Sequence, residues 1–266
     1  MQTVEHKQRY HMMTGYVDFA EYYDYDHDIS FDIPFYIDYA HQCQSPILEL
    51  ASGTGRLVIP LAKAGFDVYG VDLSDNMLEV CRKAIHEQPF EQRVHLFTAD
   101  MAHFDLARKD FHLAYIALRS FMHLLSMEEQ LACVQRVYNH LQPQGQFIIS
   151  VIAPDKEKLD RRPSNEFTVQ REFDLPNGHH VQRKERLVQH DRANQVRHFE
   201  FKFEEFNSTG RLVRERVVPL KTRYIFRQEL QIYLETAGFQ IVNIYRDYNK
   251  TPYDGTGEII AIARRP

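Results

Sequence analysis

Short apolar runs alternate with amphipathic stretches through the first half of the chain. The runs are bounded by turn residues and are too short for helices, which is typical of buried strands; they span residues 47–51, 67–72, 94–99, 111–118 and 147–152. Between them, apolar side chains recur at helical spacing, as after the N-cap residue Ser74 and over 128–141. This alternation predicts a mostly parallel α/β sheet with helices on both faces and right-handed crossovers.

Residues 166–225 follow a different period. Phe199, Phe201 and Phe203 alternate with charged residues, which favours a strand with one covered face. Asn177-Gly178 and Ser208-Thr209-Gly210 are turn signals. We therefore expect an antiparallel β meander inserted after the fifth strand, with the phenylalanine rings on its covered face. A helix over 227–237 and strands over 239–245 and 258–263 then complete the main sheet.

These patterns divide the chain into an N-terminal helical lid (1–45), a cofactor-binding core (46–160), the β insertion (161–226) and the C-terminal part of the core (227–266). Between residues 16 and 39 there are seven Asp and Glu, nine Tyr and Phe, and no Lys or Arg. Two interpretations stay open for this segment: helices that pack their rings on the core, or a lid whose rings and carboxylates favour a cationic ligand.

Composition limits the class of protein. The chain has 266 residues, 44% of them hydrophobic and 26% charged, and a formal net charge of −5, so it lacks a global basic footprint for nucleic acid. Residues 155–227 nonetheless hold 17 Lys and Arg against 12 Asp and Glu, which indicates either a solvated surface or a segment that meets an anionic partner.

The cysteines and the lengths of the apolar runs indicate the cellular compartment in which we expect the protein. Three scattered cysteines without a CxxC pair favour a reducing compartment, with neither a disulfide framework nor a structural zinc site; they are Cys43, Cys81 and Cys133. No run approaches 18 apolar residues and the N-terminus has no leader-like pattern, so we expect a cytoplasmic protein that does not span a membrane.

The strongest chemical signal is the segment Glu49-Leu-Ala-Ser-Gly53-Thr-Gly55-Arg56, between a strand and a helix. Glycines there let the backbone approach a ligand and expose helix N-terminal N–H groups. Asp72, at the end of the next strand, is placed to accept ribose hydroxyls. These residues predict a ligand that contains adenosine.

Two residues distinguish among such ligands. A dinucleotide fingerprint needs a third small residue where this chain has Val58. Glu49 would repel a pyrophosphate but suits a ligand that carries an ammonium and a sulfonium group. A nicotinamide oxidoreductase is therefore the less favoured interpretation.

Four segments together resemble the motifs of class I S-adenosylmethionine-dependent methyltransferases: 49–56, 72–78, 99–101 and 141–145. The resemblance implies a Rossmann-like fold with a seven-stranded sheet and S-adenosylmethionine as cofactor, with Asp72 on the ribose, Met77 beside the adenine and Asp100 facing the adenine amino group. The residues it assigns to cofactor binding are Tyr23, Glu49, Ala51, Gly53, Gly55, Arg56, Asp72, Leu73, Met77, Asp100, Met101 and Leu118. No metal ligand is expected.

A narrower resemblance concerns the acceptor. Ala20–Asp24, Ser120–Leu124 and the β insertion are similar to small-molecule methyltransferases of the aminosugar N,N-dimethyltransferase type. This similarity implies that Tyr23 lies over the cofactor and that His123 faces the acceptor. An imidazole there is suited to take a proton from an amine or hydroxyl, although one of 14 histidines near an apolar run is often structural.

The function expected from these residues is direct in-line methyl transfer to an amine or hydroxyl of a small molecule. A nucleic acid or membrane partner is not expected, and a homodimer stays open. Two alternatives stay open as well. The basic balance of residues 155–227 permits an RNA or protein methyltransferase, and the β insertion permits a non-catalytic cofactor-binding module that serves as an interaction surface.

Overall fold

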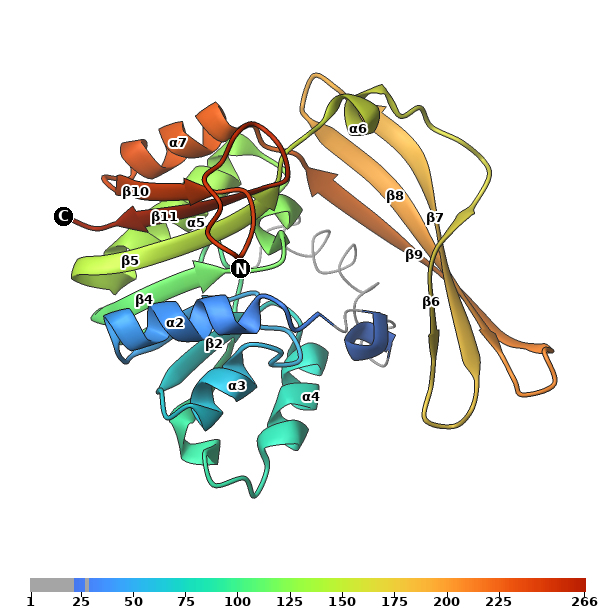
Figure 1. Ribbon diagram of the computed structural model, residues 1–266, viewed down its shortest axis with the longest axis horizontal. Helices are drawn as coiled ribbons and strands as arrows, with labels where there is room; N and C mark the ends of the chain where they lie inside the picture. The colour runs from blue at the N-terminus through green and yellow to red at the C-terminus, as the bar shows by residue number, and fades with distance from the viewer. Residues whose placement is uncertain (1–21, 27–28) are drawn as a thin grey trace, which may run out of the picture. The chain divides into compact units, whose positions relative to one another are not determined.

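The structure is a computed structural model, which describes residues 22–26 and 29–266 (Figure 1). It divides into two compact units. One joins residues 22–26 and Ile29 with Glu157–Thr222, and the other, called the core unit below, joins Ser30–Lys156 with Arg223–Pro266. Part of the acidic and aromatic N-terminal segment, including Ala20 and Glu21, lies outside the described residues.

The core unit is built on a seven-stranded sheet in the order β10-β11-β5-β4-β1-β2-β3. Strand β11 runs antiparallel to β5 and β10, and the other neighbours are parallel. This confirms the predicted mostly parallel α/β fold with a reversed last strand. The bounds are β1 Ile47–Leu50, β2 Val68–Asp72, β3 Val94–Thr98, β4 Phe111–Ile116, β5 Leu141–Ile152, β10 Gln240–Tyr245 and β11 Glu258–Arg264.

Helices cover both faces of this sheet, with α2 in front of it and α5 behind it in Figure 1. Ser74 caps α4 as predicted, because its side chain accepts a hydrogen bond from the Met77 amide. Helix α5 begins with a capping box formed by Ser126 and Glu129. The bounds are α2 Ile33–Cys43, α3 Val58–Lys63, α4 Asp75–Ile85, η1 Glu91–Arg93, η2 Ser120–His123, α5 Met127–His140, α6 Lys156–Asp160 and α7 Arg227–Thr236.

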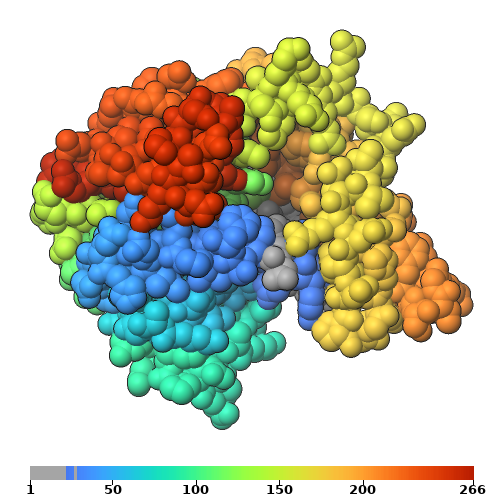
Figure 2. Space-filling model, in the orientation of Figure 1, coloured from blue at the N-terminus to red at the C-terminus, as the bar shows by residue number. Residues whose placement is uncertain are grey.

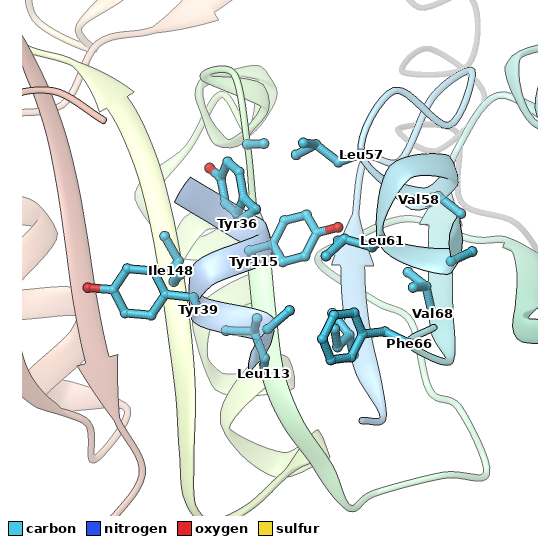
Figure 3. Packing of buried hydrophobic residues seen from close by; sticks show 14 of the residues in the cluster. Tyr36, Tyr39, Leu57, Val58, Leu61, Phe66, Val68, Leu113, Tyr115 and Ile148 are labelled. Carbon is cyan, nitrogen blue, oxygen red and sulfur yellow. The ribbon is translucent and has the colours of Figure 1, made fainter. Parts of the chain in front are cut away.

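Helix α2 is part of the core unit, whereas the sequence pattern placed residues 30–45 with the N-terminal lid. The physical reason is its aromatic face: Phe35, Tyr36 and Tyr39 are buried, and the ring of Tyr36 lies 4.8 Å from that of Tyr115 on β4. Figure 3 shows these tyrosines among aliphatic side chains of α3 and the sheet. Burying three large rings favours docking of this helix on the sheet.

The loop between β10 and β11 packs on the same helix. Tyr248 contacts Phe35 with a ring separation of 5.4 Å, and Lys250 pairs with Asp38 and lies 5.0 Å from the ring centre of Tyr39. In Figure 2 the red atoms of this loop lie against the blue atoms of α2. The loop therefore covers α2 from the outside and fixes its position on the sheet.

The second unit contains a four-stranded antiparallel sheet in the order β6-β7-β8-β9, which confirms the predicted insertion. The bounds are β6 Thr168–Asp174, β7 His180–Asp191, β8 Val196–Phe206 and β9 Leu212–Arg223. Turns form at both predicted places, where Gly178 and Gly210 adopt positive φ. Phe199 and Phe203 are buried and Phe201 is half-buried. The covered face therefore carries these rings, as expected.

Residues 22–26 are helical and pack on this sheet. The ring of Tyr22 stacks on Phe203 at 5.6 Å, and its hydroxyl donates to Glu205 over 2.6 Å. Asp26 pairs with Arg183 at 3.0 Å. Part of the N-terminal segment is thus a cover for the inserted sheet. Among the described residues, no helix combines the length and apolar character needed to cross a membrane.

Candidate active site

The loop between β1 and α3 has the backbone that its glycines predict. Ala51, Gly53 and Gly55 all adopt positive φ, of 56°, 55° and 90°. A Cβ on Gly55 would lie 2.4 Å from the sulfur of Cys81, so only glycine fits there. The loop therefore holds its amides in an arrangement that ordinary residues resist, at the edge of the sheet where ligands bind in such folds.

Asp72 joins this loop to the loop after β2. Its carboxylate is 8% exposed and accepts 2.8 Å hydrogen bonds from the backbone amides of Gly53 and Ser74. Burial raises the pKa of Asp72, and the two amides oppose that rise. Each carboxylate oxygen keeps further acceptor capacity, so bracing the loops is compatible with accepting ligand hydroxyls.

Glu49 is buried at the carboxyl end of β1. Its Oε2 accepts a 2.9 Å hydrogen bond from the hydroxyl of Tyr115 on the neighbouring strand. Burial raises the pKa of Glu49 to about 8, although Tyr115 and the charge of Arg56 lower it. A pKa in this range means that the side chain is mostly protonated at neutral pH until a cation approaches it.

Arg56 points its guanidinium at Asp32, beside the start of α2. The two side chains form a bidentate pair with distances of 2.6 and 2.8 Å, and the Asp32 side chain is fully buried. Such a fork-shaped contact fixes both partners. The structure thus gives Arg56, predicted as a cofactor contact, a role in anchoring the glycine loop to α2.

Four more residues of the predicted cofactor set follow the carboxyl ends of β2 and β3. Met77 is buried, and its Cε would be 3.6 Å from a Cβ on Gly53. Asp100 is 6% exposed and accepts a 2.8 Å hydrogen bond from the Ala102 amide. Leu73 and Met101 are half-buried. Because β1, β2 and β3 are adjacent and parallel, the structure brings these side chains to one edge of the sheet.

The chain turns sharply after β4. Leu118 and Arg119 are consecutive residues with φ of 46° and 67°, a conformation that costs non-glycine residues energy. A 3₁₀ helix, η2, follows and ends at His123. Phe121 is buried and His123 is half-buried, consistent with rings that point in different directions. The loop lies at the same carboxyl edge as the glycine loop.

One residue of the predicted cofactor set does not belong to the unit that carries this edge. Tyr23 is half-buried in the other unit, so its assignment over the cofactor stays a prediction. No group of three His, Cys, Asp or Glu side chains suited to a metal ion occurs within residues 22–26 and 29–266.

Two buried residues of the site were missed from the sequence, Tyr115 and Asp32. A signal for Tyr115 did exist, because it alternates with Leu113 on one face of β4, beside β1. Asp32 gave no comparable signal, since its partner Arg56 is 24 residues away.

Comparisons with known proteins agree with the resemblance to methyltransferases that the sequence motifs indicate. Residues 47–145 match the family described as "Methyltransferase domain". A protein of Geobacillus sp. (strain WCH70) that carries the provisional name of a methyltransferase is 32% identical over 143 residues, which are 51% of this chain and 57% of that protein. The chain thus spans about half the length of the curated relatives it matches.

Solved structures resemble more of the chain. The CcbJ methyltransferase from Streptomyces caelestis has a TM-score of 0.74 at 23% identity, over 93% of this chain and 96% of that one. CalS10, a SAM-bound amino pentose methyltransferase from Micromonospora echinaspora, has a TM-score of 0.67 at 19% identity, over 88% and 90%. At these identities the likeness establishes the shared fold.

Proposed function

We propose, from the methyltransferase domain that the chain carries over residues 47–145, that this protein transfers a methyl group from S-adenosylmethionine to a small-molecule acceptor. The observation that carries the proposal is the meeting of Glu49, Gly53, Asp72 and Asp100 at the carboxyl ends of three adjacent strands. A glycine loop flanked by buried carboxylates matches a ligand with ribose hydroxyls, an adenine amino group and a cationic amino acid end.

The residues of this edge fit the cofactor in their chemistry. Asp72 would accept the ribose hydroxyls, Asp100 would face the adenine amino group, and Met77 would pack beside the ring. Glu49 lies below the loop, where a cationic ligand end would convert it to the carboxylate. When bound, the cofactor supplies a methyl group on a sulfonium, which is already activated for transfer.

The protein's own part is then to orient the acceptor and remove its proton. Leu118 and His123 lie on the loop after β4, at the same edge of the sheet. We assign the imidazole of His123 to take the proton from an acceptor amine or hydroxyl, because its loop lies at this edge and histidine is the side chain that most often serves as a general base. Positioning of the acceptor nitrogen or oxygen behind the methyl group would supply much of the acceleration.

The charges of the inserted sheet favour a small acceptor over a polyanion. Several basic residues of this segment form ion pairs with acids: Lys184 with Glu204, Lys202 with Glu204 and Glu215, Arg186 with Glu200, and Arg161 with Glu185. Paired cations attract a phosphate backbone weakly. The solved relatives, among them an amino pentose methyltransferase, support an acceptor that carries an amine or a hydroxyl.

Titration calorimetry with S-adenosylmethionine, S-adenosylhomocysteine and NAD tests the first step. We expect micromolar binding of the first two and none of NAD; binding of NAD alone would refute the proposal. The second step is tested by release of S-adenosylhomocysteine in the presence of amino sugars, simple amines, RNA and peptides. Turnover confined to RNA or peptides would overturn the proposed acceptor class.

A further inference from the structure

We propose that Arg223 is a positioning residue for the loop that follows β4 and that it acts through Gln130. The inference rests on the proposed function, because that loop carries Leu118 and His123. Arg223 ends β9, the strand that returns the chain from the inserted sheet, and its side chain is buried in the core unit. Neither Arg223 nor Gln130 lies within the glycine loop or the loop after β4.

The loop after β4 needs support because its backbone is strained. Leu118 and Arg119 follow one another with positive φ, and such residues persist only where surrounding contacts determine them. On one side, Arg119 pairs with Glu258 at the start of β11. That pair is partly exposed, since the Arg119 side chain is 50% accessible, and exposed pairs contribute little. Buried contacts further along the loop therefore matter more for its conformation.

Gln130 makes such a contact from α5, at the end of the loop. Its side chain is fully buried, and its amide Nε2 donates a 2.9 Å hydrogen bond to the backbone carbonyl of Leu124, the residue after His123. A buried amide has a single geometry in which both ends are satisfied. The Leu124 carbonyl is thus fixed by a side chain that is itself part of a buried network.

Arg223 completes the network at the other end of Gln130. Its Nη1 donates to Gln130 Oε1 over 2.6 Å, and its Nη2 donates to Glu229 Oε1 over 2.5 Å. The Tyr233 hydroxyl also donates to Glu229 over 2.5 Å. Arg223 is 3% exposed, so these charge-assisted bonds form away from solvent. Two hydrogen bonds therefore connect the end of β9 to the carbonyl that follows His123.

One substitution distinguishes a role in positioning the loop after β4 from a general role in stabilising the fold. Gln130→Glu keeps an acceptor for Arg223, and strengthens that contact by its charge, but it removes the donor to the Leu124 carbonyl. Gln135→Glu, which makes the same chemical change elsewhere on α5, is the matched control. Arg223→Met removes the network from its other end, and Arg223→Lys restores the charge.

Hydrogen exchange followed by mass spectrometry measures how often the loop after β4 opens, and it needs no acceptor. In Gln130→Glu we expect amides of residues 121–125 to exchange about three- to tenfold faster, the change in local opening expected for one lost hydrogen bond, while the protein stays folded. Gln135→Glu should match the wild type. Arg223→Met should accelerate the same peptide, and Arg223→Lys should partly reverse the effect. Unchanged exchange of 121–125 in folded Gln130→Glu would overturn the proposal.

A kinetic measurement completes the test once an acceptor is in hand. We expect Gln130→Glu to lower kcat by about tenfold or more, since small misplacements in a site are costly, while the Kd for S-adenosylhomocysteine changes less than about twofold. Equal kcat in the variant and the wild type would overturn the positioning role. If exchange responds as expected but no acceptor is methylated, the proposed function fails and the structural coupling stands.

Discussion

Glu49 gives the sharpest test of the proposed cofactor site, because its charge should change when the cofactor binds. Burial raises its pKa to about 8. At pH 7 about nine in ten of these side chains then hold a proton in the free protein. A bound ammonium or sulfonium nearby favours the carboxylate and lowers that pKa. Binding at pH 7 should therefore release up to about one proton from Glu49.

The raised pKa of Glu49 determines how cofactor affinity and the stability of the free protein change with pH. Affinity for S-adenosylmethionine should rise by up to about tenfold per pH unit as pH increases toward 8, because less free energy is needed to remove the proton. Stability of the free protein should change in the opposite direction. The contribution of Glu49 is fully present below its unfolded-state pKa near 4.5 and is lost as pH rises through about 8.

Calorimetry at pH 7 in buffers of different ionisation enthalpy counts the released protons. The amino group of the cofactor also titrates near about pH 8, so the measurement needs a reference that lacks the carboxylate. Glu49→Gln is that reference, since its amide oxygen still accepts from Tyr115 and carries no titrating proton. Equal proton release by the wild type and Glu49→Gln would refute the coupling and place the cationic end of the cofactor elsewhere.

Three further substitutions test the site at other points. Asp72→Ala should weaken S-adenosylhomocysteine binding by about 1–3 kcal/mol in calorimetry, and an unchanged Kd in a folded variant would remove it from the ribose site. His123→Ala should lower turnover by about a hundredfold with little effect on cofactor affinity, whereas full activity would leave the imidazole without a role in proton removal. Gly55→Ala, with its Cβ 2.4 Å from Cys81 Sγ, should lower the free energy of unfolding in urea by about 2–4 kcal/mol. Gly65→Ala, at a similar φ in open space, is its control and should cost less.

Much of the fold follows from the sequence, because each strand and helix has a local pattern. The strand at 111–118 was predicted two residues too long, since Ala117 and Leu118 continue its apolar run. The β7–β8 turn was missed because it contains no glycine. There, Asp191 accepts from the Asn194 amide over 3.1 Å, and Gln195 takes the positive φ.

The site was only partly predictable, because some of its residues follow a local pattern and others are paired across long sequence separations. The spacing of Gly53, Gly55 and Asp72 makes them recognisable in the sequence, because the geometry of the loop restricts which residues fit at these positions. The Arg56–Asp32 pair and the Gln130–Arg223 contact join residues 24 and 93 positions apart. No periodic pattern encodes such pairings, and they appear only when packed elements fix which buried polar groups face each other.

The strand order has a consequence for how the chain is made. Strand β11 follows β10 in the sequence but lies between β10 and β5, so β10 has no other neighbour in the described sheet until β11 is in place. During synthesis the parallel strands β1 to β5 emerge first, and the inserted sheet follows. Closure of the sheet then depends on residues 258–264, which must pair with both β5 and β10. Until that step the β5 edge is unpaired and open to association with other chains.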